Sequence, residues 1–184
     1  MSGDYSRFTD RPRRRYSGVL MQQGRVQLDA DWNEHVDIAQ RRWEVQAQDT
    51  FGPSAVPKAT TPNGFKISAA GANDLAIAAG RIYVDGKLAE LFPGEQVGNP
   101  PAAVSYLHQP FYPDPPALPA GAKTVFLDVW DREVTYIEDP EILEKALGGP
   151  DTATRRQTVW QVRWQKSEDG KTAACGAAAP PASS

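Results

Sequence analysis

RIYVDGKLAEL, residues 81–91, is the stretch that decides the fold. Arg81–Val84 and Lys87–Leu91 have the composition of short strands, and Asp85-Gly86 lies between them. A type I′ turn needs positive φ at both central positions, and Asp-Gly between two such runs is therefore a strong hairpin signal. The stretch predicts an antiparallel hairpin.

More β structure is predicted on both sides of this hairpin. Phe65–Ile67 and Leu75–Ile77 are short strand candidates upstream. Downstream, Lys123–Ile137 predicts a second hairpin that turns at Asp131-Arg132. After a short helix over Pro140–Leu147, a last strand over Thr158–Gln165 has alternating residues on one face: Thr158, Trp160, Val162 and Trp164.

Residues 29–50, DADWNEHVDIAQRRWEVQAQDT, predict an amphipathic helix that Gly52-Pro53 ends. Asp31 and Glu34 have the spacing of a capping box. A stripe of residues recurs on one face at steps of three and four: Trp32, Val36, Ala39, Trp43 and Ala47. This stripe either packs on the protein's own sheet or forms a seam between subunits.

Two segments have little regular pattern. Residues 93–120 hold eight of the 16 prolines, which predicts a long irregular loop. Residues 1–25 are basic, with aromatic residues at intervals. Such a segment is either a disordered tail or an extended arm that docks onto a surface. In the second case its contacts come from charged and aromatic side chains: Tyr5, Arg7, Phe8, Arg13, Arg14, Arg15 and Tyr16.

The expected architecture is therefore α+β. It consists of a docking arm over residues 1–25, an amphipathic helix over residues 26–52, a β-rich body over residues 53–168 and an Ala/Pro/Ser-rich tail or linker over residues 169–184. Hydrophobic residues make up 40% of the 184, which is enough for a core.

Composition argues against several classes of function. The net charge of −3 and the pI of about 5.4 make nucleic acid an improbable main partner. No apolar stretch is long enough for membrane insertion, and the polar stretch Met1–Arg15 has no leader pattern, which predicts synthesis in the cytoplasm. Cys175 is the single cysteine, so neither an intrachain disulfide nor a multi-cysteine zinc site is expected.

No residues are expected to be catalytic, to bind a cofactor or to ligate a metal. His35 and His108 are the only histidines, and neither has a companion at zinc-ligand spacing. Asp128 and Glu133 face each other loosely across the predicted second hairpin, where surface charges are the ordinary explanation for such a pair. We therefore predict a protein that is not an enzyme.

Arg155 and Arg156 follow Asp151, which is expected to cap a turn over Thr152–Arg156. The two arginines are either solvated charges or partners for carboxylates of a neighbouring protein, since the planar guanidinium suits interface ion pairs.

Four stretches together resemble a family encoded with contractile injection systems. These stretches are GDYSRF at residues 3–8, YSGVLMQQGRVQLDADWNE at 16–34, GRIYVDG at 80–86 and GPDTATRRQTVWQVR at 149–163. A more distant likeness is to the N-terminal regions of phage tail-fibre and baseplate proteins. The resemblance implies a structural, homo-oligomeric component of a tail-like particle, with a trimer as the guess and baseplate proteins as partners.

The resulting prediction is a protein that attaches a fibre or appendage to a baseplate. Its predicted contact residues are the arm side chains given above, the helix residues Trp32, Val36, Ala39 and Trp43, and Arg155 and Arg156. The alternatives are a carbohydrate-binding module of a tail fibre, in which exposed aromatic side chains stack on sugars, and a glycan-degrading tail enzyme with two carboxylates in a cleft.

Overall fold

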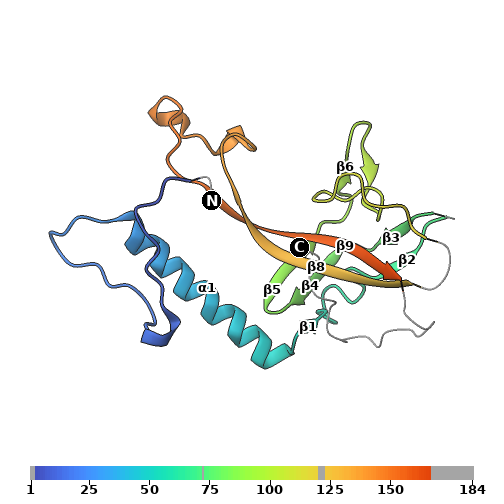
Figure 1. Cartoon of the computed structure of the whole chain (residues 1–184), viewed down its shortest axis with the longest axis horizontal. Coiled ribbons are helices and arrows are strands. Elements are labelled where there is room, and N and C mark those ends of the chain that lie inside the picture. Colours follow the sequence, from blue (N-terminus) through green and yellow to red (C-terminus); the bar gives the residue numbers. More distant parts are fainter. Residues whose placement is uncertain (1–2, 72, 120–122, 167–184) are drawn as a thin grey trace. The chain divides into compact units, whose positions relative to one another are not determined.

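The computed structural model describes residues 3–71, 73–119 and 123–166. Cys175 and the predicted tail lie outside these residues. The helices and strands are η1 (Pro12–Arg14), α1 (Asp29–Phe51), β1 (Ser54–Ala55), β2 (Ile67–Ala69), β3 (Leu75–Ile77), β4 (Gly80–Val84), β5 (Lys87–Leu91), β6 (Gln96–Val97), β7 (Ala102–Ala103), β8 (Lys123–Val134), η2 (Pro140–Ile142), η3 (Lys145–Leu147) and β9 (Arg155–Lys166) (Figure 1). Because the described residues form one α-helix and mainly antiparallel strands, the class is α+β.

The chain forms two compact units. Unit 1 consists of Met1–Thr50 and Asp131–Gln157, and unit 2 consists of Phe51–Trp130 and Thr158–Ser184. The paired strands β8 and β9 contribute to both units, because the boundaries fall within each strand. Part of the segment expected to belong to the β-rich body, residues 131–157, therefore lies with the arm and the helix in unit 1.

Unit 2 contains the predicted hairpin. In β4 and β5, Val84 is in register with Lys87, and Asp85 and Gly86 have φ of 47° and 81°. These values are the two positive φ angles that a type I′ turn requires, so the prediction is confirmed. β1 pairs with the other edge of β4, and β2 pairs with β3.

The core of unit 2 is built around Trp160. The rings of Phe65 and Trp160 meet edge to face with centroids 4.9 Å apart. The Trp160 Nε1 donates to the Glu90 carbonyl oxygen at 2.9 Å, so the buried indole has a hydrogen-bond partner. The buried members of this cluster are Phe65, Ile77, Ala89, Leu91, Val104, Tyr106, Trp160 and Val162.

A buried glutamine joins the proline-rich segment to β9 within this core. The Gln109 Nε2 donates to the Val162 carbonyl oxygen at 3.0 Å, and the Val162 amide donates to the Gln109 Oε1 at 2.7 Å. The side-chain amide thus takes the place of a strand neighbour. Tyr106, from the same proline-rich segment, is also buried in this core.

Three predictions downstream of residue 120 need correction. β8 is one continuous strand over Lys123–Val134, so the turn at Asp131-Arg132 is wrong. In place of a helix over Pro140–Leu147 there are two 3-10 turns, η2 and η3, and Gly148 closes the second with φ of 88°. Residues 151–154 form no turn, because they lead directly into β9.

Candidate partner-binding surface

The base of the arm is held to its own unit by hydrogen bonds. Ser6 contacts Asp29, the first residue of α1, twice: its amide donates to Oδ2 at 2.9 Å and its Oγ donates to Oδ1 at 2.7 Å. Farther along the arm, the Thr9 hydroxyl donates to the Glu34 carboxylate. These contacts fix the path of residues 6–9 along the first turns of the helix.

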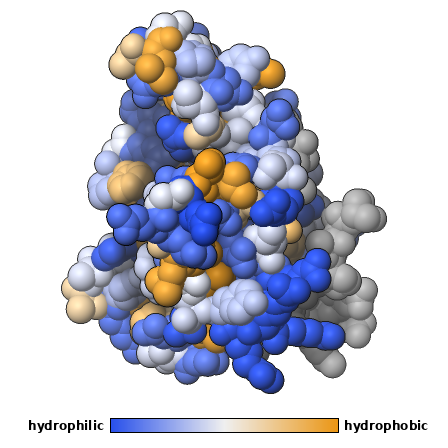
Figure 2. Space-filling view, turned by 90° about the vertical axis from the view of Figure 1, so that its left-hand side faces the viewer, coloured by the Kyte–Doolittle hydropathy of each residue, from blue (hydrophilic) through white to orange (hydrophobic). Residues whose placement is uncertain are grey.

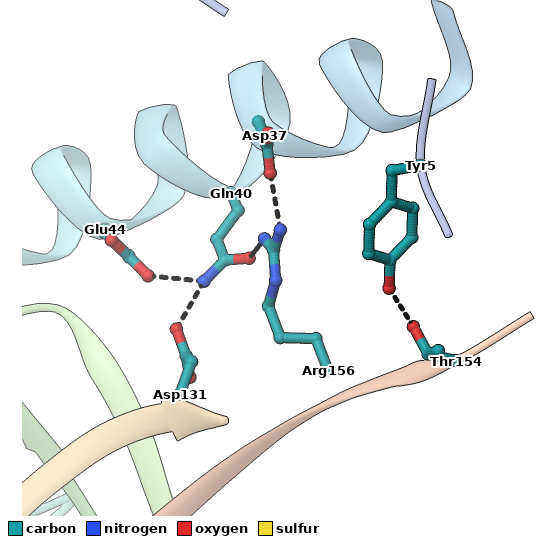
Figure 3. Close-up of polar contacts among 7 residues, drawn as sticks. All are labelled: Tyr5, Asp37, Gln40, Glu44, Asp131, Thr154 and Arg156. Carbon is teal, nitrogen blue, oxygen red and sulfur yellow. Dashed lines mark hydrogen bonds and ion pairs between the residues drawn. The ribbon is translucent and has the colours of Figure 1, made fainter. Parts of the chain in front are cut away.

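Tyr5 fixes the arm to the β8–β9 ribbon. Its hydroxyl donates to the Glu133 carboxylate. The same hydroxyl shares a hydrogen bond with the Thr154 hydroxyl (Figure 3). The Gly3 amide donates to the same Glu133 carboxylate at 3.1 Å. Tyr5 is predicted to fill a pocket on a partner, and in the structure its hydroxyl is bonded within the chain.

These contacts shift the pKa values of two groups. Burial, with the hydrogen bond to Glu133, raises the pKa of the Tyr5 phenol. The hydrogen bonds from the Ser6 hydroxyl and amide lower the pKa of the Asp29 carboxyl. Both shifts favour the protonation states, neutral phenol and ionised carboxylate, that the observed contacts need.

The polar face of α1 contacts the ribbon through Arg156. The Arg156 Nη2 lies 2.6 Å from the Asp37 Oδ1, and the same guanidinium donates to the Gln40 Oε1 (Figure 3). Gln40 in turn donates to Asp131 at 2.9 Å and to Glu44 at 2.7 Å. Arg156 was expected to be solvated or to meet a carboxylate of another protein. In the structure it is paired within unit 1 with Asp37 and Gln40, and its side chain remains partly exposed. Arg155 remains exposed, and its Nη1 donates to the Thr154 carbonyl oxygen.

The cationic side chains of the arm point to solvent. Arg13 and Arg14 lie in η1, and Arg15 ends it with φ of 60°. Within residues 3–71, 73–119 and 123–166, no ion pair is formed by the exposed arginines of the arm, which are Arg7, Arg11, Arg13, Arg14, Arg15 and Arg25. Their charge is available to an acidic partner.

Apolar side chains of the arm are exposed as well. Phe8 and Tyr16 are about half exposed, although the Phe8 ring also meets the Tyr5 ring at 5.2 Å. Leu20, at 92% exposed, and Met21 were missed as contact residues. The run Val19-Leu20-Met21 in a segment without helical or strand pattern was the available signal. Figure 2 shows one face of the chain, on which hydrophobic residues lie as separate patches among hydrophilic ones.

The helix stripe is exposed. Trp32 is 62% exposed and Trp43 is 72% exposed, Val36 is also exposed, and Ala39 is partly buried. The buried residues of α1 are Ala30 and Ile38, which lie away from the stripe on the helix surface. In unit 1 the helix therefore turns its polar side toward the arm and ribbon and leaves its aromatic side open. We call Trp32, Val36, Ala39 and Trp43 the tryptophan stripe.

The other candidates do not form a common site. Asp128 and Glu133 lie on one strand, where Asp128 accepts from Arg163 at 3.4 Å and Glu133 accepts from the arm. His35 accepts weakly from the Val19 amide, and His108 bonds with Ser105. Among the residues that the structure describes, no group of three or more His, Cys, Asp or Glu side chains is placed to hold a metal ion. In the same described ranges, no helix has the length and apolar character to cross a membrane.

The fold and this surface define an α+β protein that exposes basic, aliphatic and aromatic side chains on one unit. The chain belongs to DUF6519, a family of unknown function whose model matches residues 1–176. No curated protein and no solved structure was found to match it.

Proposed function

We propose that this chain is a structural component of a contractile injection system or related phage-tail-like particle, in which it attaches a fibre or appendage to the baseplate. The resemblance of residues 3–8, 16–34, 80–86 and 149–163 to a family encoded with such systems is the reason for proposing this kind of particle. The observation that carries the proposal is an arm fixed at its base by Tyr5, Ser6 and Thr9 while the arginines beyond stay exposed and unpaired within the described residues.

This arrangement suits attachment. A segment that is already fixed at one end loses less conformational entropy on binding than a free tail does. The exposed side chains then supply both kinds of contact that interfaces use, namely arginine for ion pairs and aromatic rings for apolar pockets. Arg7, Arg13, Arg14 and Arg15 are the proposed ionic contacts, and Phe8 and Tyr16 are the proposed anchors. The extended arm and the proline-rich loop over residues 93–120 are part of this proposal.

Charge indicates what the arm binds. Residues 1–25 contain six arginines and two aspartates, whereas the remaining residues contain 14 basic and 21 acidic side chains. The arm is thus a basic segment on an otherwise acidic protein. An acidic groove on a baseplate protein would attract it, and the attraction would weaken as salt screens the charges.

The test is binding of the full chain to isolated baseplates, compared with the variant R13E/R14E/R15E. Wild type should bind, and the variant should lose roughly tenfold or more in affinity because like charges would meet. The matched control is K58E/K66E, which reverses two charges in unit 2 and should bind like wild type. Equal binding by wild type and the arm variant would overturn attachment through the arm, and failure of wild type to bind would overturn the baseplate assignment.

One observation favours a second candidate, the carbohydrate-binding module. Trp32 and Trp43 are exposed on the same face of α1, and exposed aromatic rings can stack on sugars. Glycan-array binding that is lost in W32A and W43A but kept in R13E/R14E/R15E would favour this candidate.

A further inference from the structure

We propose that two copies of the chain pair through the tryptophan stripe, with their α1 helices antiparallel about a twofold axis that passes between residues 37 and 38. This inference goes beyond attachment through the arm, because it concerns a different surface and a different partner, a second copy of the chain.

The stripe is open in a single copy. Trp32 and Trp43 are 62% and 72% exposed, which is unusual for the largest apolar side chains of a soluble surface. The rest of the α1 surface is already used in part, since Asp37 and Gln40 contact Arg156 and Ala30 and Ile38 are buried. The apolar side is therefore the side of α1 left for a partner.

The stripe is complementary to itself when reversed. Trp32 and Trp43 are centred on the point between residues 37 and 38, and so are Val36 and Ala39. At about 100° per residue, all four lie within a narrow arc of the helix surface. In an antiparallel pair each Trp32 meets the partner's Trp43, and each Val36 meets the partner's Ala39. The small central residues let the helices approach while the indoles pack at both ends.

Charge on one flank of the stripe agrees with the antiparallel arrangement. Asp31 and Arg42 lie on the same flank, Asp31 in the first half of α1 and Arg42 in the second. Reversal places Arg42 on the same flank as the partner's Asp31, whereas in a parallel pair these two side chains would lie on opposite flanks. In the described part of the chain, neither side chain forms an ion pair of its own.

The size of the stripe sets the expected strength. The two indoles are about 16 Å apart along the helix. Together they expose on the order of 250 Å² per copy, so the helix pair alone falls below the size of a standard stable interface. We therefore expect a weak, concentration-dependent dimer. A contact between like surfaces needs a twofold axis, so this contact gives pairs and does not give the trimer that the resemblance implies.

The first test is sedimentation of the full chain over a range of concentrations. Wild type should show a monomer–dimer equilibrium, and W43A and A39E should weaken it by roughly tenfold or more because they remove an anchor or oppose like charges. Both positions are at the helix surface, and a far-ultraviolet circular dichroism spectrum checks that the variants fold. V45E is the matched control, because Val45 is exposed on another side of α1. R13E/R14E/R15E should dimerise like wild type, which separates this proposal from attachment through the arm.

The second test fixes the direction of the helices. In a background with Cys175 replaced by Ser, a tagged W32C copy and an untagged W43C copy are mixed and oxidised. Disulfide formation between the two different variants, above that within either variant alone, is expected for antiparallel helices. Preferential W32C–W32C linkage would overturn the arrangement. A chain that stays monomeric at every concentration would overturn the pairing and leave the stripe to a glycan or a baseplate protein.

Discussion

Asp37 of α1 and Arg156 of β9 form an ion pair in which the Asp37 Oδ1 lies 2.6 Å from the Arg156 Nη2. The pair joins residues 119 positions apart in the chain, and Gln40 accepts from the same guanidinium. The Arg156 side chain is 44% exposed, so solvent screens the attraction. The contact sets the orientation of the helix more than it adds to the free energy of unfolding.

A double-mutant cycle measures this contact. D37A and R156A should show a coupling energy of about 0.5–1 kcal/mol in urea unfolding, and the coupling should shrink at high salt. R155A is the control, since Arg155 bonds only to nearby carbonyl oxygens among its described contacts. Additive effects of D37A and R156A would mean that the pair does not form in solution.

Tyr5→Phe tests the fixed base of the arm. The substitution keeps the ring but removes the hydroxyl that contacts Glu133 and Thr154, so the arm should lose about 1 kcal/mol of local stability. Backbone ¹⁵N relaxation should show increased motion of residues 3–9. Tyr16→Phe alters an exposed tyrosine of the same arm and should leave these residues unchanged. An unchanged arm in both variants would show that the phenol contributes nothing to the position of the arm.

The Ser6–Asp29 contact makes the arm sensitive to acid. Because the pKa of Asp29 is lowered in the folded protein, the contact stabilises the fold above the carboxyl's ordinary pKa, and this contribution is lost as the pH falls through the lowered value. Ser6→Ala removes the largest cause of the shift, so the pKa of Asp29 should rise toward its ordinary value. A ¹³C titration of the side-chain carboxyl measures it, with Ser17→Ala as the control. A pKa that stays equally low in Ser6→Ala would contradict the role of the hydroxyl.

Local signals predicted local structure. The Asp85-Gly86 turn and the extent of α1 follow from neighbouring residues, and both are found as predicted to within a residue or two. The predicted turn at Asp131-Arg132 was wrong because Arg132, unlike Gly86, does not favour the positive φ that the second position of such a turn requires. β8 runs straight through this position, because the strand that pairs with it is β9, which begins 21 residues after β8 ends.

The sequence alone could not predict which side of α1 faces the rest of unit 1. An aromatic stripe on a helix ordinarily packs inward, and no local signal shows that Asp37, Gln40 and Glu44 face the arm and ribbon instead. That arrangement depends on Arg156 and Asp131, which become neighbours of α1 only in the folded chain. For the same reason, the sequence could not show that Tyr5 and Arg156 have hydrogen-bond partners within the chain while the arginines of the arm remain exposed.

Gly64→Ala tests the close approach of two backbone segments in unit 2. A Cβ on Gly64 would lie 2.4 Å from the Arg81 carbonyl oxygen and 2.8 Å from the Arg81 nitrogen, so one backbone segment must move. Arg81 belongs to β4, which is paired with β1 and β5 on its two edges. Moving this strand would therefore disturb its hydrogen bonds to the neighbouring strands. We expect a loss of about 2 kcal/mol or more in the free energy of unfolding of unit 2. Gly18→Ala is the control, because its Cβ would meet only the His35 ring at an ordinary 3.6 Å, and it should change stability by less than about 0.5 kcal/mol. Equal stability of Gly64→Ala and wild type would mean that β4 and the segment around Gly64 are farther apart in solution than in this fold.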